Sequence, residues 1–306
     1  MEPEMQVTAT LLDEFADDLV DQWEGSVAGD MSDSTVPGAP LPPWHCYSIT
    51  RHWCWNTWRA RNSDTPALTG PAASRTRHWW CANLAQAEKH YSWEAPGARE
   101  DFASLSSKLQ GAITEGNLSG AAEACSSIFR WGSVGRGRPG KPAASRIWLL
   151  EGEERGTLIS DLKDAVAALQ PDSLPGKVRC IFSMVPMNSA TTKLFAAADP
   201  LGKVAIFDGR VAAAASLLAK RFLQKRGDVK VPPELHFGWG PPGTEPTSTR
   251  DPSDSTYRFR NLNNMKDVER AECNWRLNRV VERMSGRLSL PVRRIEKALF
   301  MVGYKV

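Results

Sequence analysis

The chain has 306 residues, enough for one large domain or two smaller ones, and its 42% hydrophobic and 24% charged residues exclude a wholly disordered protein. The net charge of +3 is unevenly distributed, since residues 1–50 carry ten acidic residues and no Lys or Arg, which leaves 38 basic and 25 acidic residues in the remainder. A body this basic is compatible with a nucleic-acid partner.

No apolar run has membrane-spanning length, and the N-terminus is acidic where a signal peptide is basic. The six cysteines are scattered without framework spacing, as reduced thiols are. We therefore expect a cytoplasmic protein, a monomer, with no membrane partner.

Residues 1–43 form an acidic arm that contains one amphipathic helix and a linker rich in Gly, Ser and Pro. The arm is either a solvated segment with a docked helix or a mimic of phosphate charge that covers a basic groove. The apolar residues that recur near helical spacing are Leu11, Leu12, Phe15, Leu19 and Trp23.

Tryptophan is concentrated in residues 44–93, which hold seven of the twelve Trp residues. Most of these rings are expected in the core, because a Trp side chain buries a large area. One or two could instead stack on an extruded base or a sugar ring. We predict that residues 44–119 form a Trp-rich helical region.

Apolar residues at i, i+3 and i+4 predict helices over residues 101–116, 118–131 and 156–171, and helical patterns return near the C-terminus. Residues 240–256 predict a loop, because they are rich in Gly, Pro, Ser and Thr. Alternating strand patterns are few. The sequence therefore predicts a mostly α fold.

Several histidines and cysteines of the Trp-rich region could be assembled into a zinc site. Their spacings match no familiar zinc motif, and their Trp neighbours favour a core. We expect no metal and no cofactor. The residues concerned are His45, Cys46, His52, Cys54, His78 and Cys81.

The stretch GRGRPGKP (135–142) nearly fits the phosphate-binding loop G-x-x-x-x-G-K-[ST]. Pro142 replaces the hydroxyl residue that would hold magnesium, and no apolar strand precedes the loop, so nucleotide hydrolysis is excluded. The basic residues of the loop contact a nucleic-acid backbone or are simply solvated. They are Arg136, Arg138 and Lys141.

Asp208 follows the apolar run VAIF and precedes a helix of small residues that begins near Val211. It is either a helix N-cap or a carboxylate kept ionised by the helix N-terminus for catalysis. The segment before it, CIFSMVPMNSATTKLF, predicts two helices joined by a tight turn. Such a hairpin can present free backbone N–H groups to a DNA phosphate.

This order of hairpin, helix and aspartate resembles the helix-hairpin-helix DNA glycosylases, the superfamily of 8-oxoguanine glycosylase. Three segments look like a bacterial branch with that fold: SSIFRWGSV (126–134), MNSATTKLFAAADP with AIFDGRVAAA, and RRIEKALFMVGY (293–304). The resemblance covers residues 120–306, which we expect to be the catalytic body. It implies double-stranded DNA containing a modified base as the partner.

The resemblance also implies roles for individual residues. Asp208 would stabilise an oxocarbenium-like sugar while the N-glycosidic bond breaks, and its replacement by Asn would abolish excision while leaving binding intact. Residues of the hairpin and of the next helix start would contact DNA. They are Met187, Asn188, Ser189, Thr191, Thr192 and Arg210.

Bifunctional members of the superfamily carry a hairpin lysine that attacks the sugar. The hairpin of this chain lacks the usual Gly-x-Gly turn, and the position that aligns with the lysine is near Ser189. Lys193 lies one helical turn later, so it could reach the same face. It is either a displaced nucleophile or a solvated or phosphate-binding lysine, with water then acting as the nucleophile.

The C-terminal helix partly closes the base pocket in this superfamily, which makes Phe300 a candidate stacking residue beside Trp131; both could equally be core residues. In this family the recognition of 8-oxoguanine depends on residues around the hairpin lysine. The hairpin of this chain differs there, which argues against 8-oxoguanine as the substrate. We expect a hypermodified phage base, such as glucosylated 5-hydroxymethylcytosine, excised in antiviral defence. The alternatives are an oxidised purine in DNA repair, or a DNA-binding module without catalysis.

Overall fold

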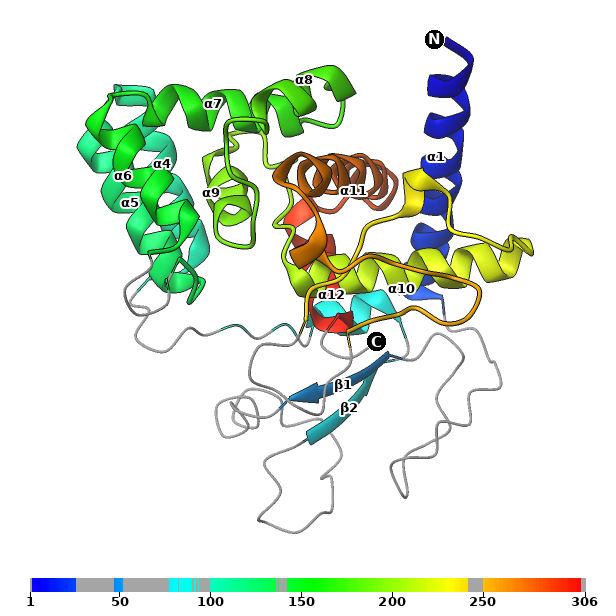
Figure 1. Cartoon of the computed structure of the whole chain (residues 1–306). Coiled ribbons are helices and arrows are strands. Elements are labelled where there is room, and N and C mark those ends of the chain that lie inside the picture. Colours follow the sequence, from blue (N-terminus) through cyan, green and yellow to red (C-terminus); the bar gives the residue numbers. More distant parts are fainter. Residues whose placement is uncertain are drawn as a thin grey trace.

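A computed structural model describes residues 2–25, 47–51, 77–81, 83–89, 91, 93, 100–135, 137, 142–241 and 250–303. The predicted mostly α class is confirmed (Figure 1). No helix among these residues has the length and apolar character needed to cross a membrane. The helices are α1 (Glu2–Glu24), α3 (Leu84–Lys89), α4 (Phe102–Glu115), α5 (Leu118–Trp131), α6 (Ala144–Glu154), α7 (Leu158–Leu169), α8 (Pro175–Ile181), α9 (Thr191–Ala198), α10 (Gly209–Arg226), α11 (Asp267–Leu288) and α12 (Val292–Val302), with short 3-10 turns at Pro233–Leu235 and Leu262–Asn264.

The Trp-rich region contains two strands, β1 (Tyr47–Arg51) and β2 (Arg77–Cys81), which pair antiparallel with Tyr47 opposite Cys81. The prediction of helix is therefore wrong for these segments. Their β-branched and aromatic residues fit a pleated sheet, and strands of this length are too short for an alternating pattern to stand out. Residues 52–76 lie outside the described part of the chain.

Two hydrophobic cores hold the helices together. The terminal core is formed mainly by α1, α3, α10, α11 and α12, and the middle core by α4 to α9. Helix α11 contributes to both, since Ala271 and Trp275 belong to the middle core while Leu277 and Val281 belong to the terminal core. In Figure 1, α4 to α9 gather on one side of α11, and α1 lies on the other.

Helix α1 is docked on the terminal core, as one interpretation of the acidic arm predicts. Its buried face includes Phe15, whose ring centroid lies 5.5 Å from that of Phe222 and 5.9 Å from that of Phe237. Its acidic residues pair with basic residues of the body, Asp17 with Arg283 and Asp18 with Lys225, each at 2.8 Å. The charge of the arm is thus partly used in holding the helix to α10 and α11.

We predict that Phe15→Ala lowers the free energy of unfolding by about 3–5 kcal/mol, because a fully buried ring leaves a cavity that its neighbours only partly fill. Urea denaturation followed by circular dichroism measures the change. Leu201→Ala, which truncates an exposed side chain, is the control and should change stability by less than about 0.5 kcal/mol. Equal effects of the two substitutions would show that α1 is not part of the core.

Candidate active site

The site begins with an extended run, residues 203–207, that pairs with no strand of the described chain. Its backbone N–H groups are bound by side chains instead. Asp199 Oδ2 accepts from the N–H groups of Lys203 at 2.6 Å and Val204 at 2.8 Å. Asn278 Oδ1 accepts from the N–H of Ala205 at 3.0 Å, and Glu296 Oε2 accepts from that of Ile206 at 3.0 Å. Thr192 Oγ1 accepts from the N–H of Phe207 at 2.8 Å. Buried backbone N–H groups require such partners, so the run is stable only where each N–H meets its acceptor.

The side chains of this run alternate between the two cores. Val204 and Ile206 pack in the middle core, and Ala205 and Phe207 pack in the terminal core. A shift by one residue would send each side chain to the wrong core, because the side-chain period of an extended chain is two. The run therefore delivers Asp208 to the junction of the two cores.

Asp208 is the N-cap of α10, and its side chain is only 10% exposed. Oδ1 accepts from the N–H groups of Arg210 at 2.9 Å and Val211 at 3.2 Å. Oδ2 lies 3.6 Å from Lys193 Nζ. Capping is thus confirmed, and it leaves the second oxygen available to the cavity.

The ionised form of Asp208 is favoured. Burial raises the pKa of this carboxyl group, but the positive charges of Lys193 and Arg210 and the two backbone donors outweigh it and hold the pKa below its ordinary value.

Lys193 comes from α9 and is 5% exposed, so its interpretation as a solvated lysine is wrong. Its Nζ donates to the carbonyl oxygen of Ser189 at 2.8 Å and faces Asp208. Gly132 makes room for it, since a Cβ at that position would lie 2.7 Å from Lys193 Cδ. Burial lowers the pKa of Lys193, although Asp208 and Glu296 act in the opposite direction, and a lowered pKa increases the share of neutral, nucleophilic amine.

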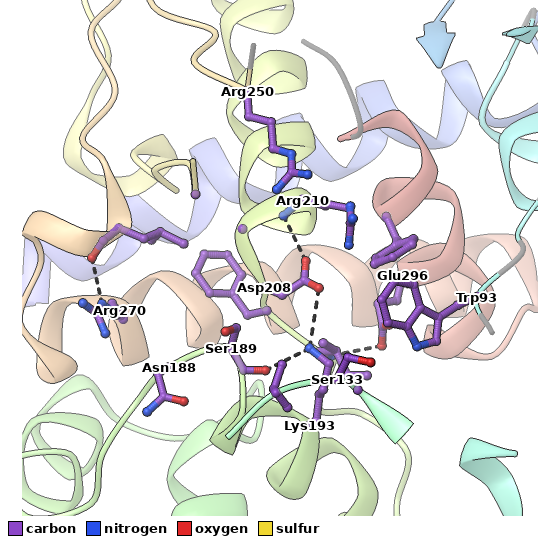
Figure 2. A pocket seen from close by; sticks show the side chains of 18 of the residues that line it. Trp93, Ser133, Asn188, Ser189, Lys193, Asp208, Arg210, Arg250, Arg270 and Glu296 are labelled. Atoms are coloured by element: carbon purple, nitrogen blue, oxygen red, sulfur yellow. Dashed lines mark hydrogen bonds and ion pairs between the residues drawn. The ribbon is translucent and has the colours of Figure 1, made fainter. Parts of the chain in front are cut away.

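The ion pair lies in a cavity of about 480 Å³, the size range of small-molecule sites, shown in Figure 2. Aromatic side chains form part of its wall: Trp93 packs edge-on against Phe300 with 5.7 Å between ring centroids, and its centroid is 6.4 Å from that of Trp131. The guanidinium carbon of Arg210 lies 4.9 Å from the Phe300 centroid. Both predicted pocket aromatics, Trp131 and Phe300, therefore line the cavity.

The hairpin differs in part from its predicted role. Met187, Asn188 and Ser189 line the cavity, but the N–H groups of Ala190 and Thr191 are not free, because both donate to Asn188 Oδ1, at 2.9 and 3.2 Å. The prediction that these two N–H groups at the helix start are free is therefore wrong, while the contact of the hairpin with a DNA phosphate stays a prediction.

Thr191 and Thr192 are fully buried, so the predicted contact of their side chains with DNA is also wrong. The Thr191 hydroxyl accepts from the N–H of Asn188 and closes the hairpin. The Thr192 hydroxyl instead accepts from the N–H of Phe207 and so links α9 to the extended run. Thr192 directly precedes Lys193, and Phe207 directly precedes Asp208.

Two sets of sequence candidates fall outside what the structure describes. Arg136, Arg138 and Lys141 are not among the described residues, and the same holds for the side chains of all six zinc candidates. Among the described side chains, no group of three or more His, Cys, Asp or Glu residues could hold a metal ion.

Sequence reasoning missed several residues of the cavity wall. Arg293 and Glu296 lie on α12 and line the cavity together with Phe300. Their spacing of i, i+3 and i+7 places all three on one helix face. A glutamate on the apolar face of a helix is unusual, and it was the sequence feature that could have identified Glu296. Arg250 and Arg270 also line the cavity and gave no local signal, nor was Trp93 singled out.

No protein-family model matches the chain, and neither does a curated protein or a solved structure.

We predict that Thr192→Val lowers the free energy of unfolding by about 1–3 kcal/mol, because it leaves the buried N–H of Phe207 without an acceptor at nearly unchanged volume. Thermal and urea denaturation measure the change. Thr114→Val, at an exposed helix position, is the matched control and should have little effect. If Thr192→Val is as stable as the wild type, the bond from Phe207 does not fix the run.

Proposed function

We propose that the protein is a DNA N-glycosylase that takes a modified base into this cavity and cleaves its N-glycosidic bond. The observation that carries the proposal is the pairing of an ionised Asp208 with a buried Lys193 in a cavity that has an aromatic wall. The resemblance of the hairpin, aspartate and C-terminal segments to helix-hairpin-helix glycosylases supports it.

The base would enter the cavity after rotating out of the duplex, since its glycosidic bond cannot be reached inside the helix. The rings of Trp93, Trp131 and Phe300 offer surfaces against which a base can stack or pack. Basic side chains in the wall, including Arg210 and Arg293, supply hydrogen-bond donors and positive charge beside the DNA backbone.

Bond cleavage leaves positive charge on the sugar, and the Asp208 carboxylate stabilises that charge where little water is present. The neutral amine of Lys193 forms a bond to C1′ as the bond from C1′ to the base breaks. The base leaves with the electron pair of that bond, and Asp208 Oδ2 is positioned to accept a proton from the resulting ammonium group. Of the two nucleophiles that the sequence left open, this geometry favours lysine over water.

The base is proposed to be a hypermodified pyrimidine of phage DNA, such as glucosylated 5-hydroxymethylcytosine. An aromatic wall suits a hexose ring as well as a base. An oxidised purine is the alternative, and the two substrates are compared in the assay below.

We predict that Asp208→Asn slows base excision by at least 10²–10³-fold, because the charge that stabilises the sugar is lost, while duplex binding is retained. The measurement scores abasic sites in duplexes with 8-oxoguanine and in glucosylated-hydroxymethylcytosine phage DNA. Borohydride trapping on abasic-site DNA, which needs no particular base, should give a covalent complex with wild type and none with Lys193→Met. DNA binding without excision or trapping by the wild-type protein would reject the enzyme in favour of the binding module.

We predict that Phe300→Leu reduces base excision about 10-fold or more, because a stacking surface worth about 1–3 kcal/mol is lost, but leaves trapping on abasic-site DNA nearly unchanged. Abasic DNA has no base to stack, so the ratio of the two rates isolates base recognition. Phe237→Leu, a buried core change that lines no cavity described here, is the control and should leave that ratio unaltered. A parallel fall of both rates in Phe300→Leu would assign Phe300 to packing alone.

A further inference from the structure

Glu296 is a second buried carboxylate in the cavity, 3% exposed, and it has no part in the mechanism above. It projects from α12, whereas Lys193 comes from α9 and Asp208 from the start of α10. Figure 2 shows the three side chains converging from these elements. Burial of an acidic group is costly unless its oxygens are bound, so each oxygen of Glu296 needs an explanation.

Both oxygens have partners in the described chain. Oε2 accepts from the N–H of Ile206, two residues before Asp208, and Oε1 forms an ion pair with Arg293, one turn earlier on α12. The bond to Ile206 reaches across 90 positions of sequence and ties the C-terminal helix to the extended run. Loss of this bond would leave the buried N–H of Ile206 without an acceptor two residues before Asp208.

Glu296 also acts electrostatically on the centre. Burial lowers the pKa of Lys193, and the positive charges of Arg210 and Arg293 lower it further. The negative charges of Asp208 and Glu296 raise the pKa of Lys193. The pKa of Glu296 itself is raised above its ordinary value, because burial and the charge of Asp208 outweigh Arg293 and the N–H of Ile206, which act in the opposite direction. Lys193 therefore titrates in a field to which two carboxylates and two guanidinium groups contribute.

We propose that Glu296 is a positioning residue of the reaction centre, which holds Asp208 in place through its bond to Ile206 and puts a second carboxylate into the cavity that contains Lys193. This inference rests on the proposed roles of Lys193 and Asp208. Two substitutions separate its two parts. Glu296→Gln removes the charge and keeps an oxygen that can accept from Ile206, while Glu296→Asp keeps the charge and shortens the reach.

The charge is tested by following the titration of Lys193 in protein labelled with ¹³C at the lysine Cε, with its signal assigned by Lys193→Met. Glu296→Gln should shift the titration to lower pH, because a carboxylate that favours the ammonium form is gone. Glu88→Gln is the matched control. Glu88 belongs to α3 and pairs at 2.8 Å with Arg294 of α12, the helix that carries Glu296, but Glu88 does not line the cavity. An unshifted titration in Glu296→Gln would overturn this part.

The positioning is tested by amide hydrogen exchange at Ile206 and by the rate of borohydride trapping on abasic-site DNA. Glu296→Asp should lose protection at Ile206 and slow trapping on the order of 10²-fold at every pH, because a displacement of about 1 Å is sufficient for such a loss. Glu296→Gln should trap as fast as wild type at alkaline pH. Wild-type protection at Ile206 in Glu296→Asp would overturn this part. Failure of the wild-type protein to trap abasic DNA would reject the proposed mechanism, while the titration and the exchange would still decide the role of Glu296.

Discussion

The candidate site depends on one piece of backbone, the extended run of residues 203–207, whose N–H groups are bound by side chains in place of a neighbouring strand. Each of these buried donors would cost about 1–3 kcal/mol if left unpaired. The acceptors come from α9, α11, α12 and the residue that follows α9, so the position of the run is fixed from several directions at once. Asp208 directly follows the run, so its backbone is held in place by the same hydrogen bonds.

The same run explains why the cavity lies between the two cores. Lys193 belongs to a helix of the middle core and Asp208 begins a helix of the terminal core, yet their charged atoms are 3.6 Å apart. Any relative movement of the cores would separate the pair. Helix α11 opposes such movement, because it contributes buried residues to both cores and Asn278 to the run. Packing far from the cavity therefore helps to set the distance between the two groups.

Local sequence patterns were enough to find one half of the site. An Asp before a helix of small residues predicted the cap at Asp208. Lys193 became a candidate through the resemblance, because it lies one helical turn after the position that aligns with the lysine of the family. The acceptors of the run could not be predicted, because Asn278 and Glu296 bind partners 73 and 90 positions away. Periodicity reports which face of a helix is apolar, and says nothing of which distant backbone group a polar side chain on that face will meet. Thr192 shows the opposite error, since the residue predicted to contact DNA is instead a buried acceptor for the N–H of Phe207.

The charges of the cavity are best understood together with the DNA that we propose it binds. A DNA strand brings phosphate charge close to Lys193, and negative charge favours the protonated amine, which cannot act as a nucleophile. Arg210 and Arg293 act in the opposite direction on Lys193, and Arg250 and Arg270 add positive charge to the same wall. An excess of arginine, which is always protonated, can offset the phosphates without competing for the proton of the lysine. On this proposal, the arginines of the wall would both attract DNA and keep Lys193 reactive once the DNA is bound.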